Sequence, residues 1–248
     1  MRSIAKLMKD WQFTGPNGVT TAVELPHTWN ARDGQDGGND YWRGCCTYCT
    51  RFAAPVYDPA QQQVWLQFEG VNASAAVLLN GQQLCTHDGG YSTFRAEVTE
   101  LLQAENQLTV RVDNSVNDRV YPQKADFTFY GGIYRDVSLL VVNKNHIALG
   151  HFGDTGVKIT PTLKEGSADI QVETLVEGEG TVAVELLDAE GRTVAKGEGE
   201  NTFLHLDAPH LWNGVKDPYL YTCVVRLLQD GQPVDEVTTR VGLRSFSV

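Results

Sequence analysis

Short runs in which hydrophobic and polar residues alternate are the feature that most constrains the fold of this chain. Because successive side chains of a strand point to opposite faces, a period of two places one set in a core and the other toward solvent. In the clearest runs the hydrophobic residues are Val64, Leu66 and Phe68; Leu108, Val110 and Val112; Val182, Val184 and Leu186; and Tyr221, Cys223, Val225 and Leu227. The pattern predicts strands along the whole chain.

Turn residues separate these runs. Asn80-Gly81 lies between two hydrophobic segments and Asp230-Gly231 between two strand-like ones, and both dipeptides favour tight hairpins. The helical signal is weak, because only Val98–Glu105 is compatible with a short helix, with Thr99 as its N-cap. Many short strands and few helices indicate an all-β protein, either a sandwich or a jelly roll.

The chain has 248 residues, which is enough for two ordinary domains. A break is expected between Val142 and Phe152, because the aromatic-rich loops precede it and closely spaced strands follow it. We expect a jelly-roll domain over 1–143 and an immunoglobulin-like β-sandwich over 144–248. The second domain would lack a disulfide, since Cys223 is its only cysteine.

Charge and composition limit the partners. The formal net charge of −11 disfavours binding to nucleic acid and to anionic membranes, and favours neutral partners such as sugars. No stretch reaches the length of about 18 apolar residues that a membrane helix needs. Lys6 and Lys9 interrupt the apolar residues near the start, and the five cysteines are an odd number, so we expect a cytoplasmic location.

Eleven short motifs, in order along the chain, carry a family resemblance. The first eight resemble the sugar-binding jelly-roll domain of family 2 glycoside hydrolases, and the last three resemble the immunoglobulin-like domain that follows it. Leu25–Trp29 and the segment 33–44 look most like β-galactosidases, and less like β-glucuronidases or β-mannosidases. The motifs are Trp11-x-Phe13, Leu25–Trp29, Asn39–Gly44, Phe68–Val71, Asn80-Gly81, Gly89–Tyr91, Phe94, Tyr130–Val137, Leu211-Trp212, Pro218–Tyr221 and Val241–Arg244.

The resemblance implies that catalysis lies outside these two domains. Retaining glycosidases need two carboxylates about 5–5.5 Å apart, and in this family both are glutamates on a (β/α)₈ barrel, the acid/base following an asparagine. This chain has no Asn-Glu dipeptide, and two β-domains use its full length up to Val248. We therefore expect a region with no catalytic residue and no cofactor, which supports the barrel of a β-galactosidase-like hydrolase and could assist homo-oligomer formation. The alternatives are a free-standing lectin-like galactose-binding module and a scaffold with no sugar contact.

Two residues are candidates for sugar contact. In the family a jelly-roll loop reaches the mouth of the active site, and Asp126, seven residues before Ile133, matches the carboxylate that accepts hydrogen bonds from sugar hydroxyls. Arg43 could donate to the sugar or to a barrel carboxylate. The alternative for Asp126 is that it only anchors its own loop.

Other features have structural explanations. If Cys46 and Cys49 lie on a strand they face opposite sides, which argues against a zinc or redox pair. The acidic loop Asp33–Asp40 offers oxygen ligands for Ca²⁺, but its spacing does not match an EF-hand, and a hydrogen-bonded loop is favoured. Thr47-Tyr48-Cys49 stands where Trp-Tyr-Arg is usual in the family, so this strand lacks a large aromatic and a cation. We expect Gly131-Gly132 to satisfy backbone requirements.

Overall fold

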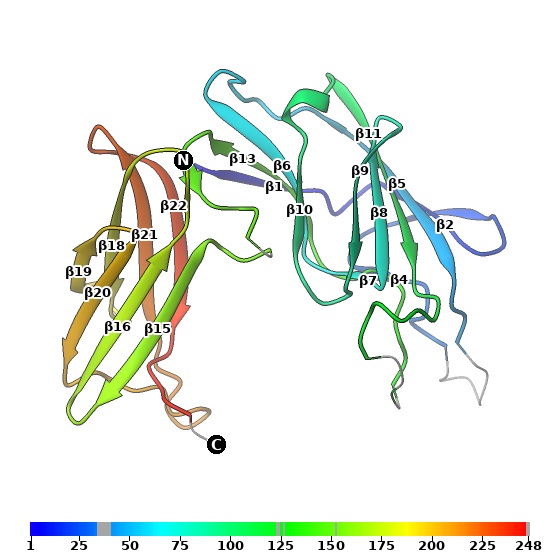
Figure 1. The fold of residues 1–248 in the computed structure, drawn as a ribbon. Helices are drawn as coiled ribbons and strands as arrows, with labels where there is room; N and C mark the ends of the chain where they lie inside the picture. Colours follow the sequence, from blue (N-terminus) through cyan, green and yellow to red (C-terminus); the bar gives the residue numbers. More distant parts are fainter. Residues whose placement is uncertain (34–40, 123–124, 126, 152, 247–248) are drawn as a thin grey trace. The chain divides into compact units, whose positions relative to one another are not determined.

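The computed structural model describes residues 1–33, 41–122, 125, 127–151 and 153–246. The chain forms two compact units, one of Ser3–Val141 and one of Val142–Val248 together with Met1–Arg2. Strands dominate the described part of both units (Figure 1). The prediction of an all-β protein, a jelly roll followed by an immunoglobulin-like sandwich, is confirmed.

The first unit is built from thirteen strands and one short 3₁₀ helix among the residues described. The elements are β1 (Ser3–Lys6), β2 (Trp11–Thr14), β3 (Thr20–Val23), β4 (His27–Thr28), β5 (Cys45–Ala53), β6 (Gln62–Phe68), β7 (Val71–Asn72), β8 (Ser74–Leu79), β9 (Gln82–Asp88), β10 (Phe94–Glu97), η1 (Thr99–Leu101), β11 (Glu105–Asp113), β12 (Gly132–Ile133) and β13 (Val137–Asn143), which continues into the second unit.

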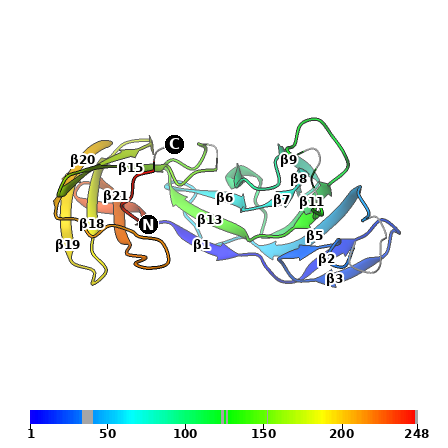
Figure 2. The same cartoon turned by 90° about the horizontal axis from the view of Figure 1, so that it is seen from below.

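Two antiparallel sheets enclose the core of this unit. One has the strand order β1-β13-β6-β10 and the other β3-β2-β5-β11-β8-β9, while the small sheet β4-β12-β7 lies among the loops at one end. Figure 2 shows β2, β3 and β5 side by side, as their pairing requires. The inward residues of the two sheets, such as Trp11, Tyr48, Leu66 and Phe68, are completely buried. Trp11 and Phe13 are therefore core residues, as large aromatics of a sandwich usually are.

Both predicted hairpins are present. Asn80 and Gly81 join β8 to β9 with φ angles of 52° and 83°, and two positive φ angles are the signature of a type I′ turn.

The segment Val98–Glu105 is not the helix that the sequence suggested. Only Thr99–Leu101 forms a 3₁₀ turn, and Glu105 already begins β11, which pairs with β5 over nine residues. The Thr99 hydroxyl does not cap a helix, because it accepts from the Val64 amide and donates to Glu97.

The second unit is a smaller sandwich. Its sheets have the orders β15-β16-β20 and β19-β18-β21-β22, with β14 and β17 forming a separate pair. The strands are β14 (His146–Ile147), β15 (Val157–Lys164), β16 (Ser167–Thr174), β17 (Val176–Glu177), β18 (Thr181–Leu187), β19 (Thr193–Glu198), β20 (Asn201–Asp207), β21 (Tyr221–Gln229) and β22 (Gln232–Val241).

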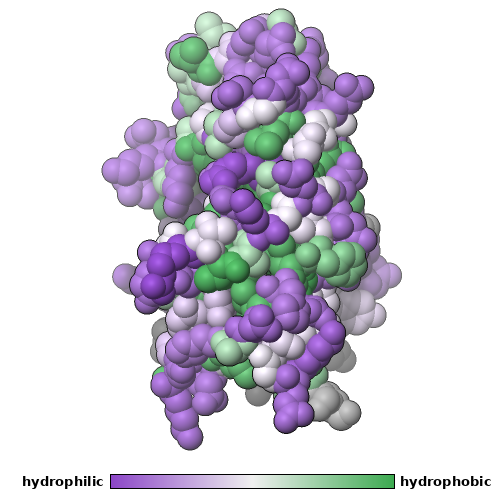
Figure 3. All heavy atoms as spheres, turned by 90° about the vertical axis from the view of Figure 1, so that its left-hand side faces the viewer, coloured by the Kyte–Doolittle hydropathy of each residue, from purple (hydrophilic) through white to green (hydrophobic). Residues whose placement is uncertain are grey.

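A core of alternating inward residues holds the second unit together. Ile170, Leu186 and Leu227 are completely buried within it, and Cys223 is a free, buried thiol. On the surface seen in Figure 3, polar and charged residues predominate and hydrophobic residues form separate patches between them. That distribution is ordinary for a folded protein. Within the described ranges, no helix has the length and apolarity needed to span a bilayer.

Candidate functional site

An aromatic hollow of about 830 Å³ lies among the loops of the first unit, at the end where β4 and β7 are found. Three of its rings are well exposed, with relative exposures of 52% for Tyr91, 50% for Phe127 and 40% for Tyr130. Clustered exposed aromatic rings commonly mark a binding surface. The residues that line the hollow are Thr28, Asn72, Tyr91, Pro122, Phe127, Thr128, Tyr130 and Tyr134.

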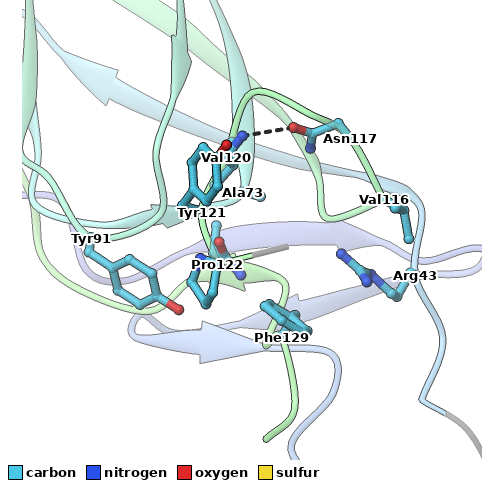
Figure 4. Close-up of a pocket in the computed structure, with 10 residues that line it drawn as sticks. Arg43, Ala73, Tyr91, Val116, Asn117, Val120, Tyr121, Pro122 and Phe129 are labelled. Atoms are coloured by element: carbon cyan, nitrogen blue, oxygen red, sulfur yellow. Dashed lines mark hydrogen bonds between the residues drawn. The ribbon is translucent and has the colours of Figure 1, made fainter. Parts of the chain in front are cut away.

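A smaller recess of about 10 Å³ adjoins the hollow and has space for about one water molecule. The two depressions share Asn72, Tyr91 and Pro122. Figure 4 shows that this recess is formed by the loop after β11, the segment before β5 and Phe129. Its lining adds Arg43, Ala73, Val116, Asn117, Val120, Tyr121 and Phe129 to the shared residues.

Arg43 is the sequence-predicted site residue that the structure places at this recess. Its Nε donates to the carbonyl oxygen of Asn114 at 2.7 Å, and its guanidinium lies 4.9 Å from the centroid of the Phe129 ring. A cation over an aromatic face is attracted by the ring quadrupole. The guanidinium also lies 5.9 Å from the centroid of the Tyr41 ring. These contacts hold the side chain at the recess, and its role in binding sugar stays a prediction.

Asp126, the other predicted contact, lies outside the described residues. Its neighbours Phe127 and Thr128 line the hollow. Residues 34–40 of the acidic loop Asp33–Asp40 also lie outside the described ranges, whereas Asp33 is described. The Oδ2 atom of Asp33 accepts hydrogen bonds from the Asn30 side chain at 2.7 Å and from the Trp42 amide at 3.1 Å. These contacts are those of a residue that anchors its loop.

Glycines at the start of β12 allow the backbone to approach its neighbours closely. A Cβ atom at Gly131 would lie 2.0 Å from Cζ2 of Trp29. Gly132 has a φ of 141°, and a Cβ atom there would lie 2.3 Å from the carbonyl oxygen of His27. Since side chains at both positions would collide, the predicted backbone role of these glycines is confirmed. The tight packing brings Tyr130 to the hollow, where its carbonyl accepts a hydrogen bond from the Asn72 side chain at 2.7 Å.

The loop that carries Tyr91 is held from both sides. On one side the Tyr134 hydroxyl donates to the Gly90 carbonyl. On the other, Arg119 donates to Asp88 at 2.8 Å, and this hydrogen bond is the main reason why the pKa of Asp88 is lowered. His87 stacks on Phe94 with ring centroids 4.2 Å apart, and burial lowers its pKa, so the ring tends to be neutral.

The Cys46–Cys49 pair has the arrangement of a strand. Cys46 is buried in the core and Cys49 lies on the opposite, partly exposed face of β5, as predicted. Burial raises the pKa of Cys46 to about 12, so the thiol stays protonated. No cluster of three potential metal ligands occurs in the part of the chain that the structure describes. Thr47 and Cys49 lie on the outer face of the six-stranded sheet.

Sequence reasoning missed several residues that build this site. Asn72 was not singled out, although it contacts both depressions and holds the Tyr130 carbonyl. Tyr91, Tyr130 and Tyr134 belong to the sequence motifs, whereas Phe127 does not, and the shared location of these rings depends on three separate loops coming together. No local pattern could have indicated this convergence, because Tyr91 and Phe127 are distant in sequence.

Comparisons with known proteins agree with the architecture. The family model "Glycosyl hydrolase 2 galactose-binding domain-like" matches residues 38–162, and "Glycosyl hydrolases family 2" matches residues 151–244. A curated β-glucuronidase of Bacteroides fragilis is 33% identical, over 97% of this chain and 37% of its own length.

Two solved structures are similar over the whole chain. The FMN-binding β-glucuronidase from Facaelibacterium prausnitzii L2-6 is 35% identical with a TM-score of 0.94, and the chain covers 40% of it. A putative β-galactosidase from Bacteroides fragilis is 34% identical with a TM-score of 0.91, and the chain covers 42% of it. The chain thus spans about two fifths of the length of these relatives.

Proposed function

Because the chain belongs to glycosyl hydrolase family 2, we propose that the loop end of its first domain contacts the carbohydrate substrate of a longer β-glycosidase. The catalytic glutamates would be supplied by the rest of that enzyme. On this proposal the two β-sandwiches support the catalytic domain and complete the rim of its active site. The chain alone would not hydrolyse glycosides.

The aromatic hollow is the observation that carries this proposal. Its exposed rings lie beside Arg43, the predicted sugar contact, in a domain whose family model is described as galactose-binding-like. Flat rings can pack against the apolar face of a sugar, and a guanidinium can donate to its hydroxyls. Phe127 and Thr128 connect the hollow to the segment of Asp126, the predicted acceptor for sugar hydroxyls.

The sugar itself is a finer proposal. The similar proteins carry the names β-glucuronidase and β-galactosidase. We propose a neutral β-galactoside, because Asp126 suits an acceptor of hydroxyl hydrogens and the chain has a net charge of −11. Assays of the full-length enzyme with nitrophenyl β-galactoside and nitrophenyl β-glucuronide distinguish the two sugars. Faster turnover of the glucuronide would contradict the galactoside proposal.

The role of the hollow is tested by removing one ring in the full-length enzyme. Phe127→Ala should lower kcat/KM by about tenfold, because it removes packing that orients the substrate. Phe203→Ala is the matched control: Phe203 is also exposed, at 67%, but lies on β20 of the second unit. Equal kinetics for wild type and Phe127→Ala would exclude the hollow from the substrate site.

A free-standing lectin is a weaker candidate, since each similar protein described above is much longer than this chain. Calorimetric titration of the 248-residue chain with galactose should give weak or undetectable binding, because the sugar site would be shared with the catalytic domain. Micromolar affinity would favour the lectin. We also propose a reducing, cytoplasmic location, which the five free cysteines support.

A further inference from the structure

Two buried asparagines, Asn30 and Asn114, join the loop segments around the hollow. Both residues are completely inaccessible to solvent. The Nδ2 atom of Asn114 donates to Oδ1 of Asn30 at 3.2 Å and to the Phe129 carbonyl at 2.9 Å. Its Oδ1 accepts from the Gly44 amide at 2.8 Å. One side chain therefore contacts three separate segments.

The Asn30 side chain extends the network to the remaining segments. Its Oδ1 also accepts from the Gly131 amide at 2.7 Å, and its Nδ2 donates to Asp33 at 2.7 Å and to the Trp42 carbonyl at 2.8 Å. Each amide group thus uses both N–H groups and its oxygen. A buried polar network with every member satisfied is rigid, and it specifies one arrangement of the chain.

The segments that this network holds are those that carry the candidate binding groups. Gly44 follows Arg43, and the segment from Phe129 to Gly131 contains Tyr130 of the hollow. Two of the three contacts of the Arg43 side chain depend on Asn114, because the Asn114 carbonyl accepts from Arg43 and the Asn114 side chain holds Phe129, whose ring Arg43 covers. The third contact is with the ring of Tyr41, at 5.9 Å.

We propose that Asn30 and Asn114 are positioning residues, which fix Arg43 and the aromatic segment 129–131 in the geometry that the substrate meets. This inference rests on the proposed function. It predicts a loss of substrate binding when the network is broken, beyond any general loss of stability.

Asn106, a buried asparagine on β11, provides a matched control. Its side chain contacts Asn80 and the backbone of Gln103. It lies near the start of β11, whereas Asn114 follows the end of this strand. At about 3.3 Å per residue the two are about 26 Å apart, so Asn106→Ala removes a buried amide far from the hollow.

The first test uses the 248-residue chain and amide hydrogen exchange. Asn114→Ala should accelerate exchange at Gly44 by about tenfold or more, because this amide loses its acceptor. Asn114→Asp retains that acceptor and removes the two N–H donors, so it should leave Gly44 protected and loosen 129–131. Asn106→Ala should change neither segment. If Asn114→Ala leaves both segments as protected as in wild type, the network does not position them.

The second test measures the kinetics of the full-length enzyme. Asn114→Ala and Asn114→Asp should raise KM more than they lower kcat, with kcat/KM falling by about tenfold. Asn106→Ala should remain within about twofold of wild type at a similar loss of thermal stability. Equal effects at Asn106 and Asn114 would show a merely structural role. Loosened loops with unchanged kinetics would instead refute the proposed function, and with it the part of the inference that concerns substrate.

Discussion

The ion pair between Arg2 and Asp235 gives the sharpest stability prediction. Asp235 is completely buried on β22, and the Arg2 side chain is only 16% exposed. Arg2 donates to both carboxylate oxygens, at 2.7 and 2.6 Å, and the Ile147 amide donates to one of them at 2.8 Å. Bidentate pairs of this kind are among the strong hydrogen bonds of proteins.

Replacement of Arg2 by methionine keeps the apolar stem and removes the charge. The buried carboxylate then retains a single backbone donor. Removal of one partner from a buried pair costs about 3–5 kcal/mol, mostly from the uncompensated charge that remains. For a unit of about 110 residues, at about 4 °C per kcal/mol, the melting temperature of the second unit should fall by about 12–20 °C.

Scanning calorimetry measures this shift, and two variants serve as controls. Lys158→Ala breaks an exposed pair with Glu173 in the same unit and should cost less than about 1 kcal/mol. The double variant Arg2→Met, Asp235→Asn removes the orphaned charge but keeps an acceptor for Ile147, so it should recover at least half of the loss. If the double variant is no more stable than Arg2→Met alone, the loss of stability in Arg2→Met does not come from the buried, unpaired charge of Asp235.

Two further predictions concern titration and thiol chemistry. Burial lowers the pKa of His27 and His87; the unfolded chain therefore binds protons more readily, and stability should fall as the pH drops below about 6.5. In urea denaturation, the free energy of unfolding should fall less steeply with decreasing pH for His87→Gln than for wild type. The same pH dependence in both proteins would contradict the prediction that His87 contributes to it. Cys46 and Cys223, whose pKa values burial raises to about 12 and about 11, should resist thiol reagents at about pH 8 until the chain unfolds. The pKa of Cys45 is also raised by partial burial, but Cys45 is exposed, so it should react first because reagents can reach it. Rapid modification of Cys46 in the native protein would refute its placement in the core.

The strands could be predicted from sequence because their signal is local. Val64, Leu66 and Phe68 alternate within the seven-residue strand β6, and Asn80-Gly81 carries its own turn geometry. The segment Val98–Glu105 was misread for the opposite reason. Its residues tolerate a helix, but the pairing of Glu105 with Ala53 is a contact between distant parts of the chain. Sheet pairing prevailed over a weak local preference.

The candidate site was predictable only in part. Arg43 was singled out through a family motif, and it lines the recess that adjoins the aromatic hollow, while its contact with sugar stays a prediction. The network of Asn30 and Asn114 could not be identified in this way, because its hydrogen bonds join residues 84 and 101 positions apart. An asparagine after a strand has many ordinary roles in turns and caps. The hydrogen bonds between Asn30, Asn114 and the loops therefore become apparent only in the folded structure.

Separation of the hollow from the sandwich core has a consequence for how such a protein can change. Tyr91, Phe127 and Tyr130 occupy connecting loops and take no part in the core of the first unit. Mutations of these rings would spare the packing on which folding depends, so natural drift or a laboratory library could explore new ligands there at little risk to expression. Asn30 and Asn114 would be the positions to leave untouched in such a library.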